Sequence, residues 1–376
     1  MLDHTDPNSL IVDAARRFSQ ERLAPTAAAR ELAGVIEPEI VAALGEMGFL
    51  GATNSSEWGG SEIPYEAYAQ VVEEIAAGDG SVSTLVSVHN APTCEILEKF
   101  GTDAQKERWL RPMMTGAAVA SFALTESGAG SDASAIRTRA VRTNSGYVVN
   151  GSKQFISNAR IGQTTILFAV TDPAAGKKGI SAFVVANDTP GFSVARVEHK
   201  LGQKASDSCA LAFDEMQVSD EQRIGAEGEG LKIALSTLES GRIGIAAQSV
   251  GMARAALDYA IAYAKERKQF GKPIIEHQAV AFRLVEAKTQ LAAARELTLR
   301  AARLKDAGQP ALEAAAMAKL FASEAAERIC SAAIQTLGGY GYLADYPVER
   351  IYRDVRVCQI YEGTSDVQKI ILSRML

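Results

Sequence analysis

Hydrophobic positions in the first 120 residues recur three and four residues apart, the spacing of one face of a helix. Ile11, Ala14, Ala15, Phe18 and Leu23 begin this pattern. Similar apolar runs follow at 37–47, 65–77, 84–99 and 103–114. Residues 53–64, rich in Ser and Gly, interrupt them and predict a loop. The pattern therefore predicts an N-terminal helical domain over residues 1–120.

The pattern changes near Ser121 to short alternating or β-branched runs with turn residues between them. Strands are predicted at 146–151, 165–172, 180–188, 192–197 and 209–218. Asn150-Gly151 is a common hairpin dipeptide, so we expect a hairpin turn there, with the return strand beginning at Lys153. Residues 121–228 are thus interpreted as a middle β-domain, a barrel or a sandwich.

Long helices return after the glycine-rich stretch 225–230. One apolar stripe continues from 276 to 306, and Pro310 opens a further helix that ends before Gly338-Gly339. Long alanine-rich helices of this kind favour a four-helix bundle over residues 229–376. The predicted fold class is α+β, mainly α: an N-terminal helical domain, a middle β-barrel or sandwich, and a C-terminal four-helix bundle.

Composition argues against several classes of function. The formal net charge of −6 offers no basic surface for nucleic acid. The four cysteines and four histidines are scattered without metal-ligand spacing, so no metal is expected. The start MLDHTDPNSL has no leader features, and no apolar run reaches the roughly 18 residues that a membrane span needs. We expect a cytoplasmic protein that does not bind membranes.

Five stretches carry residues that ordinary packing does not require. They are 122-FALTESGAGSD-132, 153-KQFISN-158, 239-ESGRIGIAAQSVG-251, 266-ERKQFGKPIIEHQ-278 and 335-QTLGGYGYLADYPVERIYRD-354. Open glycine backbone can approach a ligand closely. Each stretch also has a structural explanation: a plain turn, a packed aromatic, a salt-bridged arginine or a helix cap. The 122–132 loop lacks the lysine of a phosphate-binding loop and the third glycine of a dinucleotide fingerprint.

A sixth stretch, 359-QIYEGTSDVQ-368, raises the question of Glu362. Thr364 or Ser365 is the expected N-cap of the last helix, and a glutamate before an N-cap has no special structural role. Glu362 is therefore either a charge near a helix start or a catalytic base.

In this order, the motifs resemble the acyl-CoA dehydrogenase family. The resemblance runs from about residue 37 to the C-terminus through ALTESGAGSD, NGSKQFISN, GRIGIAAQSVG, ERKQFGKPIIEHQ, QTLGGYGY and YPVERIYRDVRVCQIYEGTSDVQ, and it is strongest to the short-chain, butyryl-type branch. It implies the same three-domain fold, a bound FAD and a homotetramer. The implied reaction is α,β-dehydrogenation of an acyl-CoA thioester to the trans-2-enoyl-CoA, with electrons passed to an electron-transfer flavoprotein.

The resemblance also assigns roles. Glu362 is implied to abstract the α-proton while the β-hydrogen leaves as hydride to the flavin, and Gly241 excludes the base position used by the isovaleryl- and long-chain-type branches. The implied FAD contacts are Phe122, Leu124, Thr125, Gly130, Ser131, Phe155, Ile156, Ser157, Arg267, Gln269, Phe270, Gln278, Gln335, Gly338, Gly339, Thr364 and Asp366. The implied substrate contacts are Ser131, Glu239, Ser240, Arg242 and Gly363. The segment at 267–278 is implied to hold the FAD phosphates across a subunit interface.

The chain departs from the family pattern at two places: Phe155-Ile156-Ser157 replaces a common Trp-Ile-Thr, and Ser127-Gly128 replaces Pro-Gly. Two alternatives remain at this stage. One is a flavoenzyme of the same fold with other chemistry: an acyl-CoA oxidase, a flavin monooxygenase or a desulfinase. The other is a catalytically silent binding subunit. Acyl length and pathway are not encoded in these motifs. A mitochondrial matrix location is expected only if a transit peptide has been removed.

Overall fold

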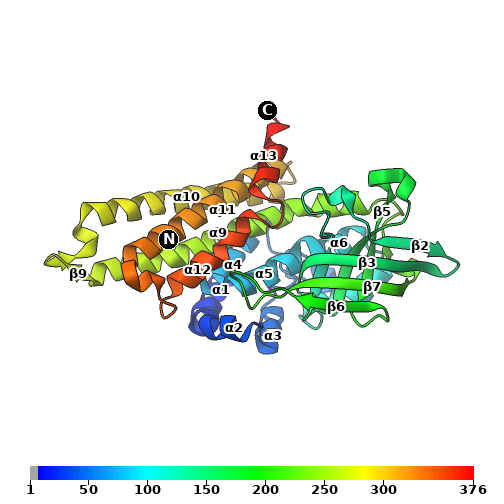
Figure 1. The fold of residues 1–376 in the computed structure, drawn as a ribbon, viewed down its shortest axis with the longest axis horizontal. Coiled ribbons are helices and arrows are strands. Elements are labelled where there is room, and N and C mark those ends of the chain that lie inside the picture. The colour runs from blue at the N-terminus through cyan, green and yellow to red at the C-terminus, as the bar shows by residue number, and fades with distance from the viewer. Residues whose placement is uncertain (1–6) are drawn as a thin grey trace.

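The structure, a computed structural model, describes residues 7–376. Residues 1–6, which include His4 and most of the stretch considered for a leader, lie outside the described part. Helices at the N-terminus, strands in the middle and long helices at the C-terminus follow one another along the chain, which confirms the predicted fold class. Figure 1 shows the long helices on one side and the sheet on the other. The domain limits at 120/121 and 228/229 stay a prediction.

The N-terminal helices are short and closely packed. They are α1 (Pro7–Phe18), α2 (Ala27–Ala33), α3 (Pro38–Glu46), α4 (Tyr65–Gly78), α5 (Gly80–Val88), α6 (Glu95–Phe100), α7 (Asp103–Gln105) and α8 (Arg111–Met114). The run 84–99, expected as one helix, is divided into α5, a π-turn at His89–Cys94 and α6. Pro92 lies inside that turn and has no N–H to donate, so the regular helix cannot continue through it.

Eight strands form one hydrogen-bonded sheet. They are β1 (Ala120–Ala123), β2 (Arg139–Thr143), β3 (Gly146–Ser157), β4 (Thr164–Val170), β5 (Ile180–Ala186), β6 (Phe192–Val197), β7 (Ser208–Val218) and β8 (Arg223–Ile224). The order is β6-β7-β3-β2-β4-β5-β8, and β1 pairs in parallel with β4. Alternate residues of β4 enter two different cores: Phe168 packs with the helical side and Leu167 with the opposite face. Both faces of β4 are therefore covered.

The expected hairpin turn at Asn150-Gly151 is wrong, because β3 continues through it to Ser157. The pairing with β7 shifts register between Val149 and Gly151, which makes this position a bulge. Gly151 has φ +148°, and a Cβ there would lie 2.7 Å from the Cα of Thr138. The Asn150 side chain exchanges two hydrogen bonds with Glu215 on β7, at 2.6 and 2.8 Å. The dipeptide thus allows β3 to pass close to Thr138 and does not reverse the chain.

The C-terminal helices are long, as the apolar stripes predict. They are α9 (Gly230–Glu266), α10 (Gln278–Asp306), α11 (Leu312–Leu337), α12 (Pro347–Val355) and α13 (Ser365–Ser373). A small hairpin of β9 (Lys268–Gln269) and β10 (Lys272–Pro273) joins α9 to α10. Within residues 7–376, no helix is both long and apolar enough to cross a membrane. Figure 1 shows α13 projecting from the body of the molecule.

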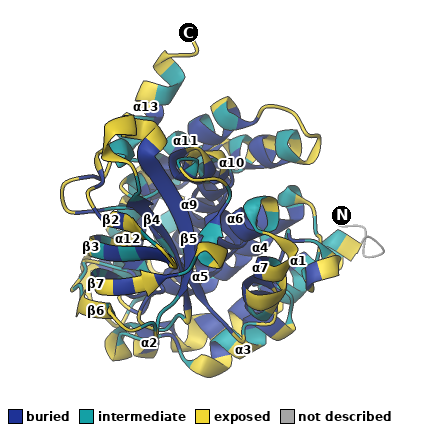
Figure 2. Ribbon diagram, turned by 90° about the vertical axis from the view of Figure 1, so that its right-hand side faces the viewer, coloured by how far each residue is buried: buried dark blue, intermediate teal, exposed yellow. Residues whose placement is uncertain are grey.

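Helix α9 is the central element of the fold. It packs against α4, α10, α11 and α12, and Figure 2 shows it dark blue, as a buried element between them. Small residues make this possible. At Gly251, a Cβ would lie 2.1 Å from the Glu73 carbonyl oxygen of α4 and 2.9 Å from the Ala76 Cβ. The α9 backbone therefore lies directly against α4 at this crossing.

A charged contact joins α4 to the end of α10. The Asp306 carboxylate accepts hydrogen bonds from the backbone N–H groups of Tyr65 and Glu66, at 2.6 and 3.0 Å. These are first-turn N–H groups of α4, which have no acceptor within their own helix. A residue 241 positions away in sequence thus caps α4.

We expect Gly251→Ala to destabilise the fold by about 1–3 kcal/mol, because the added methyl group overpacks the contact with α4. The gain of about 1 kcal/mol in helix propensity offsets part of this cost, so the net destabilisation is up to about 2 kcal/mol. Urea unfolding of the purified protein measures it. Gly128→Ala is the control, since its Cβ would meet nothing within 4 Å and its φ is not positive. Equal stability of Gly251→Ala and wild type would contradict the close packing.

Candidate functional site

Glu362 lies in a sharp turn between α12 and α13. Glu362 has φ +54° and Gly363 has φ +87°, both in the left-handed region. A non-glycine residue in this region is uncommon, and such residues cluster at functional sites. Thr364 then caps α13, with its hydroxyl oxygen accepting from the Val367 N–H at 3.2 Å. The expected N-cap is therefore confirmed at Thr364.

The Glu362 carboxylate lies against the bare backbone of α9 at Gly241. A Cβ at position 241 would lie 2.8 Å from Oε2 and 3.0 Å from Cδ of Glu362. Oε2 is buried and has no hydrogen-bond partner among the described residues. Any side chain at position 241 would occupy the space of this carboxylate.

Two buried cations share the surroundings of Glu362. Burial raises the pKa of Glu362 to about 7, and Arg242 and then Lys319 oppose that rise. Burial also lowers the pKa of Arg242, which Glu362 and Glu239 partly offset. The pKa of Lys319 falls to about 8, mainly because of burial. Because this carboxyl titrates near neutrality, it is able both to take up and to release a proton there.

Lys319 and Gln368 fix the backbone that carries Glu362. The Lys319 ammonium donates to the Gly363 carbonyl oxygen at 2.7 Å. The Gln368 amide donates to the carbonyl oxygens of Gly363 and Glu362, at 2.8 and 3.3 Å. Both side chains are fully buried. Sequence reasoning missed them, although a lysine on the alanine-rich stripe between Ala315 and Ala322 of α11 was an available signal.

Two of the stretches implied to contact a flavin, the loop after β1 and the end of β3, are joined by hydrogen bonds. The Lys153 ammonium donates to the Leu124 carbonyl oxygen at 2.9 Å and pairs with Glu126 at 2.8 Å. The backbone N–H of Gln154 donates to the Thr125 carbonyl oxygen at 2.9 Å. The loop after β1 and the end of β3 therefore form one surface.

The side chains of this surface differ in exposure. Phe155 has φ +60° and its side chain is 63% exposed, whereas the neighbouring Ile156 is buried. Phe122 packs its ring 5.0 Å from that of Phe168. Residues Gly130 and Ser131 lie exposed, and Ser157 is half-buried. An exposed phenylalanine beside open glycine backbone is a surface suited to cover a flat aromatic group.

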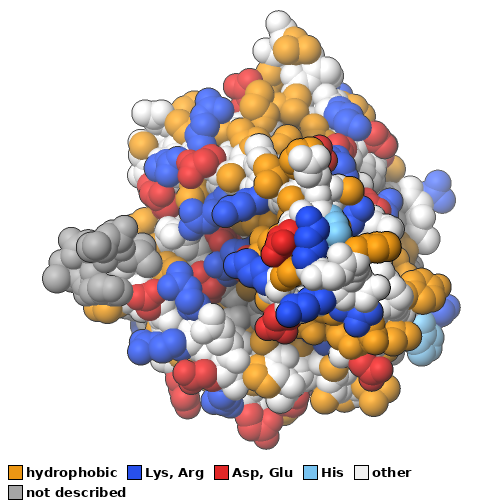
Figure 3. All heavy atoms as spheres, turned by 90° about the vertical axis from the view of Figure 1, so that its left-hand side faces the viewer, with side chains coloured by type: hydrophobic (Ala, Val, Ile, Leu, Met, Phe, Trp, Pro, Cys, Tyr) orange, Lys and Arg blue, Asp and Glu red, His pale blue; other side chains and the backbone are white. Residues whose placement is uncertain are grey.

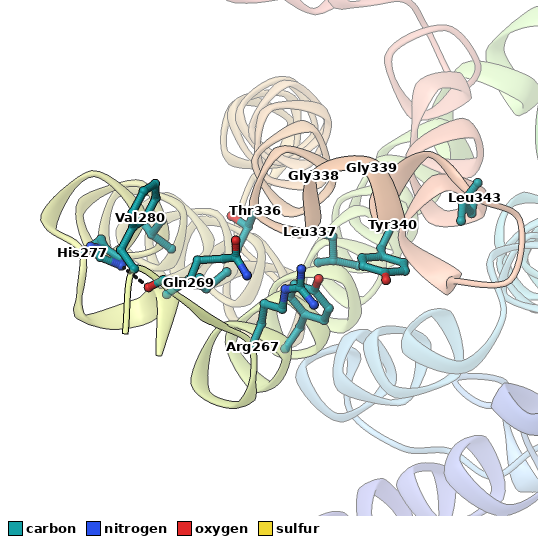
Figure 4. A pocket seen from close by; sticks show the side chains of 13 residues that line it. Arg267, Gln269, His277, Val280, Thr336, Leu337, Gly338, Gly339, Tyr340 and Leu343 are labelled. Atoms are coloured by element: carbon teal, nitrogen blue, oxygen red, sulfur yellow. Dashed lines mark hydrogen bonds between the residues drawn. The ribbon is translucent and has the colours of Figure 1, made fainter. Parts of the chain in front are cut away.

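A second set of the implied cofactor residues lines a pocket of about 860 Å³ where α9, the β9–β10 hairpin and the end of α11 meet (Figure 4). The implied residues that line it are Arg267, Gln269, Phe270, Gly338 and Gly339. Gln278 and Gln335 are next to lining residues but do not line the pocket themselves.

Two further residues of this pocket, Tyr340 and His277, had been missed. The Arg267 guanidinium lies 5.6 Å from the Tyr340 ring centre, and His277 contacts the Gln269 carbonyl oxygen at 3.1 Å. In Figure 3, which faces this end of the molecule, hydrophobic side chains are mixed with Lys and Arg. Phe270 is 95% exposed.

Within one chain, the site at Glu362 and the pocket at Arg267 lie far apart. Gly241 and Arg267 mark the two sites on α9, and 25 helical residues between them correspond to about 37 Å. Thr364 lies in the turn that carries Glu362, and the Asp366 side chain is 89% exposed at the start of α13. Glu239 and Ser240 precede Gly241 on α9. The expected site residues therefore fall at two places on the molecule.

Metal ligation finds no support in the described part of the chain, where no group of His, Cys, Asp and Glu side chains has a suitable arrangement. The four cysteines are buried and free.

Comparison with known families decides the relationship. The acyl-CoA dehydrogenase N-terminal, middle and C-terminal domain families match residues 5–117, 121–216 and 228–376. The chain belongs to the acyl-CoA dehydrogenase family. It is an oxidoreductase of this FAD-dependent family.

Individual relatives match this chain over nearly its whole length. A short-chain specific acyl-CoA dehydrogenase of Clostridium acetobutylicum is 41% identical over 98% of this chain and 97% of its own. The solved butyryl-CoA dehydrogenase of Megasphaera elsdenii matches with TM-score 0.97 and 40% identity, over 100% and 99% of the two chains. A chain from the structure described as "Electron transferring flavoprotein of Acidaminococcus fermentans: Towards a mechanism of flavin-based electron bifurcation" matches with TM-score 0.97, 41% identity and the same coverage.

The environment of Glu362 predicts a pH-dependent cost to stability. Its pKa is about 7 in the fold against 4.5 as the ordinary value, so the folded state loses stability as pH rises from about 4.5 to about 7, and the loss then levels off. We expect Glu362→Gln to be more stable than wild type at pH 8, by up to about 3 kcal/mol, and nearly equal at pH 4.5. Urea unfolding at both pH values measures this. Glu107→Gln, at a surface ion pair, is the control. A pH-independent difference would contradict it.

Proposed function

We propose that this protein catalyses the α,β-dehydrogenation of a short-chain acyl-CoA thioester to the trans-2-enoyl-CoA, with Glu362 as the base that removes the α-proton. The observation that carries the proposal is the buried Glu362 carboxylate, whose free Oε2 lies against Gly241. A base must be deprotonated to act and must be basic enough to take a proton, which its pKa near 7 permits. The names of the relatives support the short-chain class.

The backbone that carries the base is held rigidly. Lys319 and Gln368 donate hydrogen bonds to the carbonyl oxygens of residues 362 and 363. These bonds fix the main chain from which the carboxylate side chain extends. We propose that the Glu362 N–H binds the thioester oxygen, where negative charge develops as the α-proton leaves. Gly363 would lie beside the thioester. Arg242, with Glu239 and Ser240 before it on α9, would contact the CoA portion, and Ser131 would line the path of the substrate.

FAD fits the surfaces present. The exposed Phe155 and the loop at 122–131 offer a face for its ring system. Thr364 and Asp366, which follow Glu362 closely in the sequence, are proposed as further FAD contacts. The pocket with Arg267 supplies a cation and open glycine backbone, which suit phosphate groups. When bound, FAD supplies the hydride acceptor that the reaction requires.

A second copy of the chain is part of this proposal. Within one chain, the Glu362 site and the phosphate pocket lie about 37 Å apart along α9, so we propose that the pocket of one copy completes the site of another. Exposed apolar side chains near that pocket support such an interface, among them Phe270, Phe282 and Val285. We propose the homotetramer of the family as the assembly, and an electron-transfer flavoprotein as the electron acceptor.

The central test is Glu362→Gln. The variant should retain FAD, because the carboxylate is not among the surfaces assigned to the cofactor. Its rate of flavin reduction by butyryl-CoA should fall by about 10²–10⁴-fold, the usual contribution of a general base. Anaerobic stopped-flow absorbance measures both flavin content and reduction. Glu107→Gln is the control and should behave as wild type. Reduction of the Glu362→Gln flavin at the wild-type rate would refute the assignment.

Lys319 offers a second test through pH. The ionised carboxylate is the active form, so the rate of flavin reduction should rise with pH through about 7 and then level off. Lys319 lowers the pKa of Glu362, so Lys319→Met should move this rise to higher pH. The full pH profile of flavin reduction is the measurement. A uniform loss of rate with an unmoved profile would show that Lys319 positions the backbone at Gly363 without setting the pKa of Glu362.

A further inference from the structure

Unpartnered polar atoms concentrate beside Glu362. Ten buried side-chain nitrogen or oxygen atoms have no hydrogen-bond partner within the described chain, and five of them belong to one region of the fold. These five are Tyr68 Oη, Glu95 Oε2, Ser240 Oγ, Arg242 Nε and Glu362 Oε2. A buried polar atom without a partner destabilises the fold, so such a concentration points to a ligand that completes the hydrogen bonds.

Helix α9 connects these atoms in space. Gly241 and Gly244 are three residues apart and lie on one face of the helix. The Glu362 carboxylate lies against Gly241. At Gly244, a Cβ would lie 2.5 Å from the Ser87 Oγ and 3.8 Å from the Tyr68 Oη. The two hydroxyl groups are therefore about one helical turn from the base.

Glu95 extends this polar lining. The negative charge of Glu95 is, after burial, the main cause that raises the pKa of Tyr65, and it also raises the pKa of Tyr68. Lys305 lies between Glu95 and Glu239, at 3.4 and 3.7 Å, and its ammonium lies 4.7 Å from the Tyr65 ring centre. Glu239 immediately precedes Ser240 on α9. Tyr68, Glu95 and Ser240 are thus linked through direct neighbours.

The charge of this lining favours a neutral guest. Glu95 Oε1 pairs with Lys99 at 2.5 Å and with Lys305 at 3.4 Å, so its charge is already compensated, while Oε2 remains an open acceptor. A cationic substituent would meet Lys305 as well as Glu95. A hydroxyl group can donate to the carboxylate and accept from a tyrosine or serine hydroxyl at once. Tyr68 and Ser240 have the hydroxyl groups of Ser87 and Tyr65 as neighbours, whereas a plain hydrocarbon chain would leave the buried Glu95 Oε2 without a donor.

We propose that the acyl group of the substrate carries a hydroxyl on a carbon beyond the β-carbon, and that Tyr68, Ser240 and Glu95 bind it. This inference rests on the proposed dehydrogenation and specifies its substrate class. The reaction itself is unchanged: the α-proton goes to Glu362 and the β-hydride goes to the cofactor. The hydroxyl group is bound by the site but does not react. A site that binds a substrate hydroxyl discriminates strongly against the analogue that lacks it, because its buried polar groups are then unpaired.

The experiment compares matched substrates on the FAD-loaded enzyme. Butanoyl-CoA is paired with 4-hydroxybutanoyl-CoA, and pentanoyl-CoA with 5-hydroxypentanoyl-CoA. Anaerobic flavin bleaching gives kcat/KM for each. We expect at least one hydroxyacyl-CoA to exceed its unsubstituted partner by about tenfold or more. The ratio within one enzyme preparation is independent of flavin content and of the folded fraction.

Three variants assign the preference to residues. Ser240→Ala and Tyr68→Phe each remove one hydroxyl group and should reduce the ratio, and Glu95→Leu should reverse it in favour of the unsubstituted chain. Glu107→Leu, the same change at an exposed position paired with Arg111, should keep the wild-type ratio.

The outcomes separate the two proposals. If the wild-type enzyme uses the unsubstituted chains equally well or better, this inference is overturned, because ordered water would then satisfy the polar atoms, and the proposed dehydrogenation still stands. If all three variants keep the wild-type ratio, the inference is overturned as well. If neither class of substrate bleaches the flavin, the proposed function itself is rejected.

Discussion

The close approach of other segments to α9 is the constraint on which the rest of the structure depends. A helix of 37 residues, about 55 Å long, is buried among helices of both helical domains and touches the sheet. Only small side chains permit this, because each neighbour must approach nearly to the helix backbone. Gly251 admits α4, and Gly241 admits the carboxylate of Glu362. The same helix therefore builds the core and provides the floor of the site.

Much of the fold could be predicted from the sequence because it follows from local burial patterns. The stripes of α10 and α11 and the strands β4 to β7 follow directly from the spacing of apolar residues, and the Thr364 cap from local chemistry. The Asn150-Gly151 turn could not be predicted correctly, because Thr138 and Glu215 decide its geometry. Lys319 was missed for a related reason: its partner, the Gly363 carbonyl oxygen, is 44 residues away. Contacts between distant segments leave little trace in a single sequence.

The candidate site gains its chemical character from a balance between burial and charge. Burial alone would hold Glu362 protonated to a higher pH, and the neighbouring cations bring its pKa back to about 7. Each cation is itself buried and loses proton affinity as a result. Three ionisable groups removed from water thus adjust one another. Because of this mutual adjustment, the pKa of one residue cannot be judged without the other two. In the sequence alone, Glu362 is only one glutamate near the start of a helix.

The contact between Asp306 and the first turn of α4 has a consequence for synthesis of the chain. Residue 306 leaves the ribosome long after residues 65 and 66, and α9, against which α4 packs, also comes later. Although α1 and α5 pack against α4 early, the part of its apolar face that contacts α9 and α10 stays uncovered until those helices have been synthesised. Exposed surface of this kind is what chaperones recognise during translation. The N-terminal helices are thus expected to remain dependent on chaperones until the C-terminal bundle has emerged.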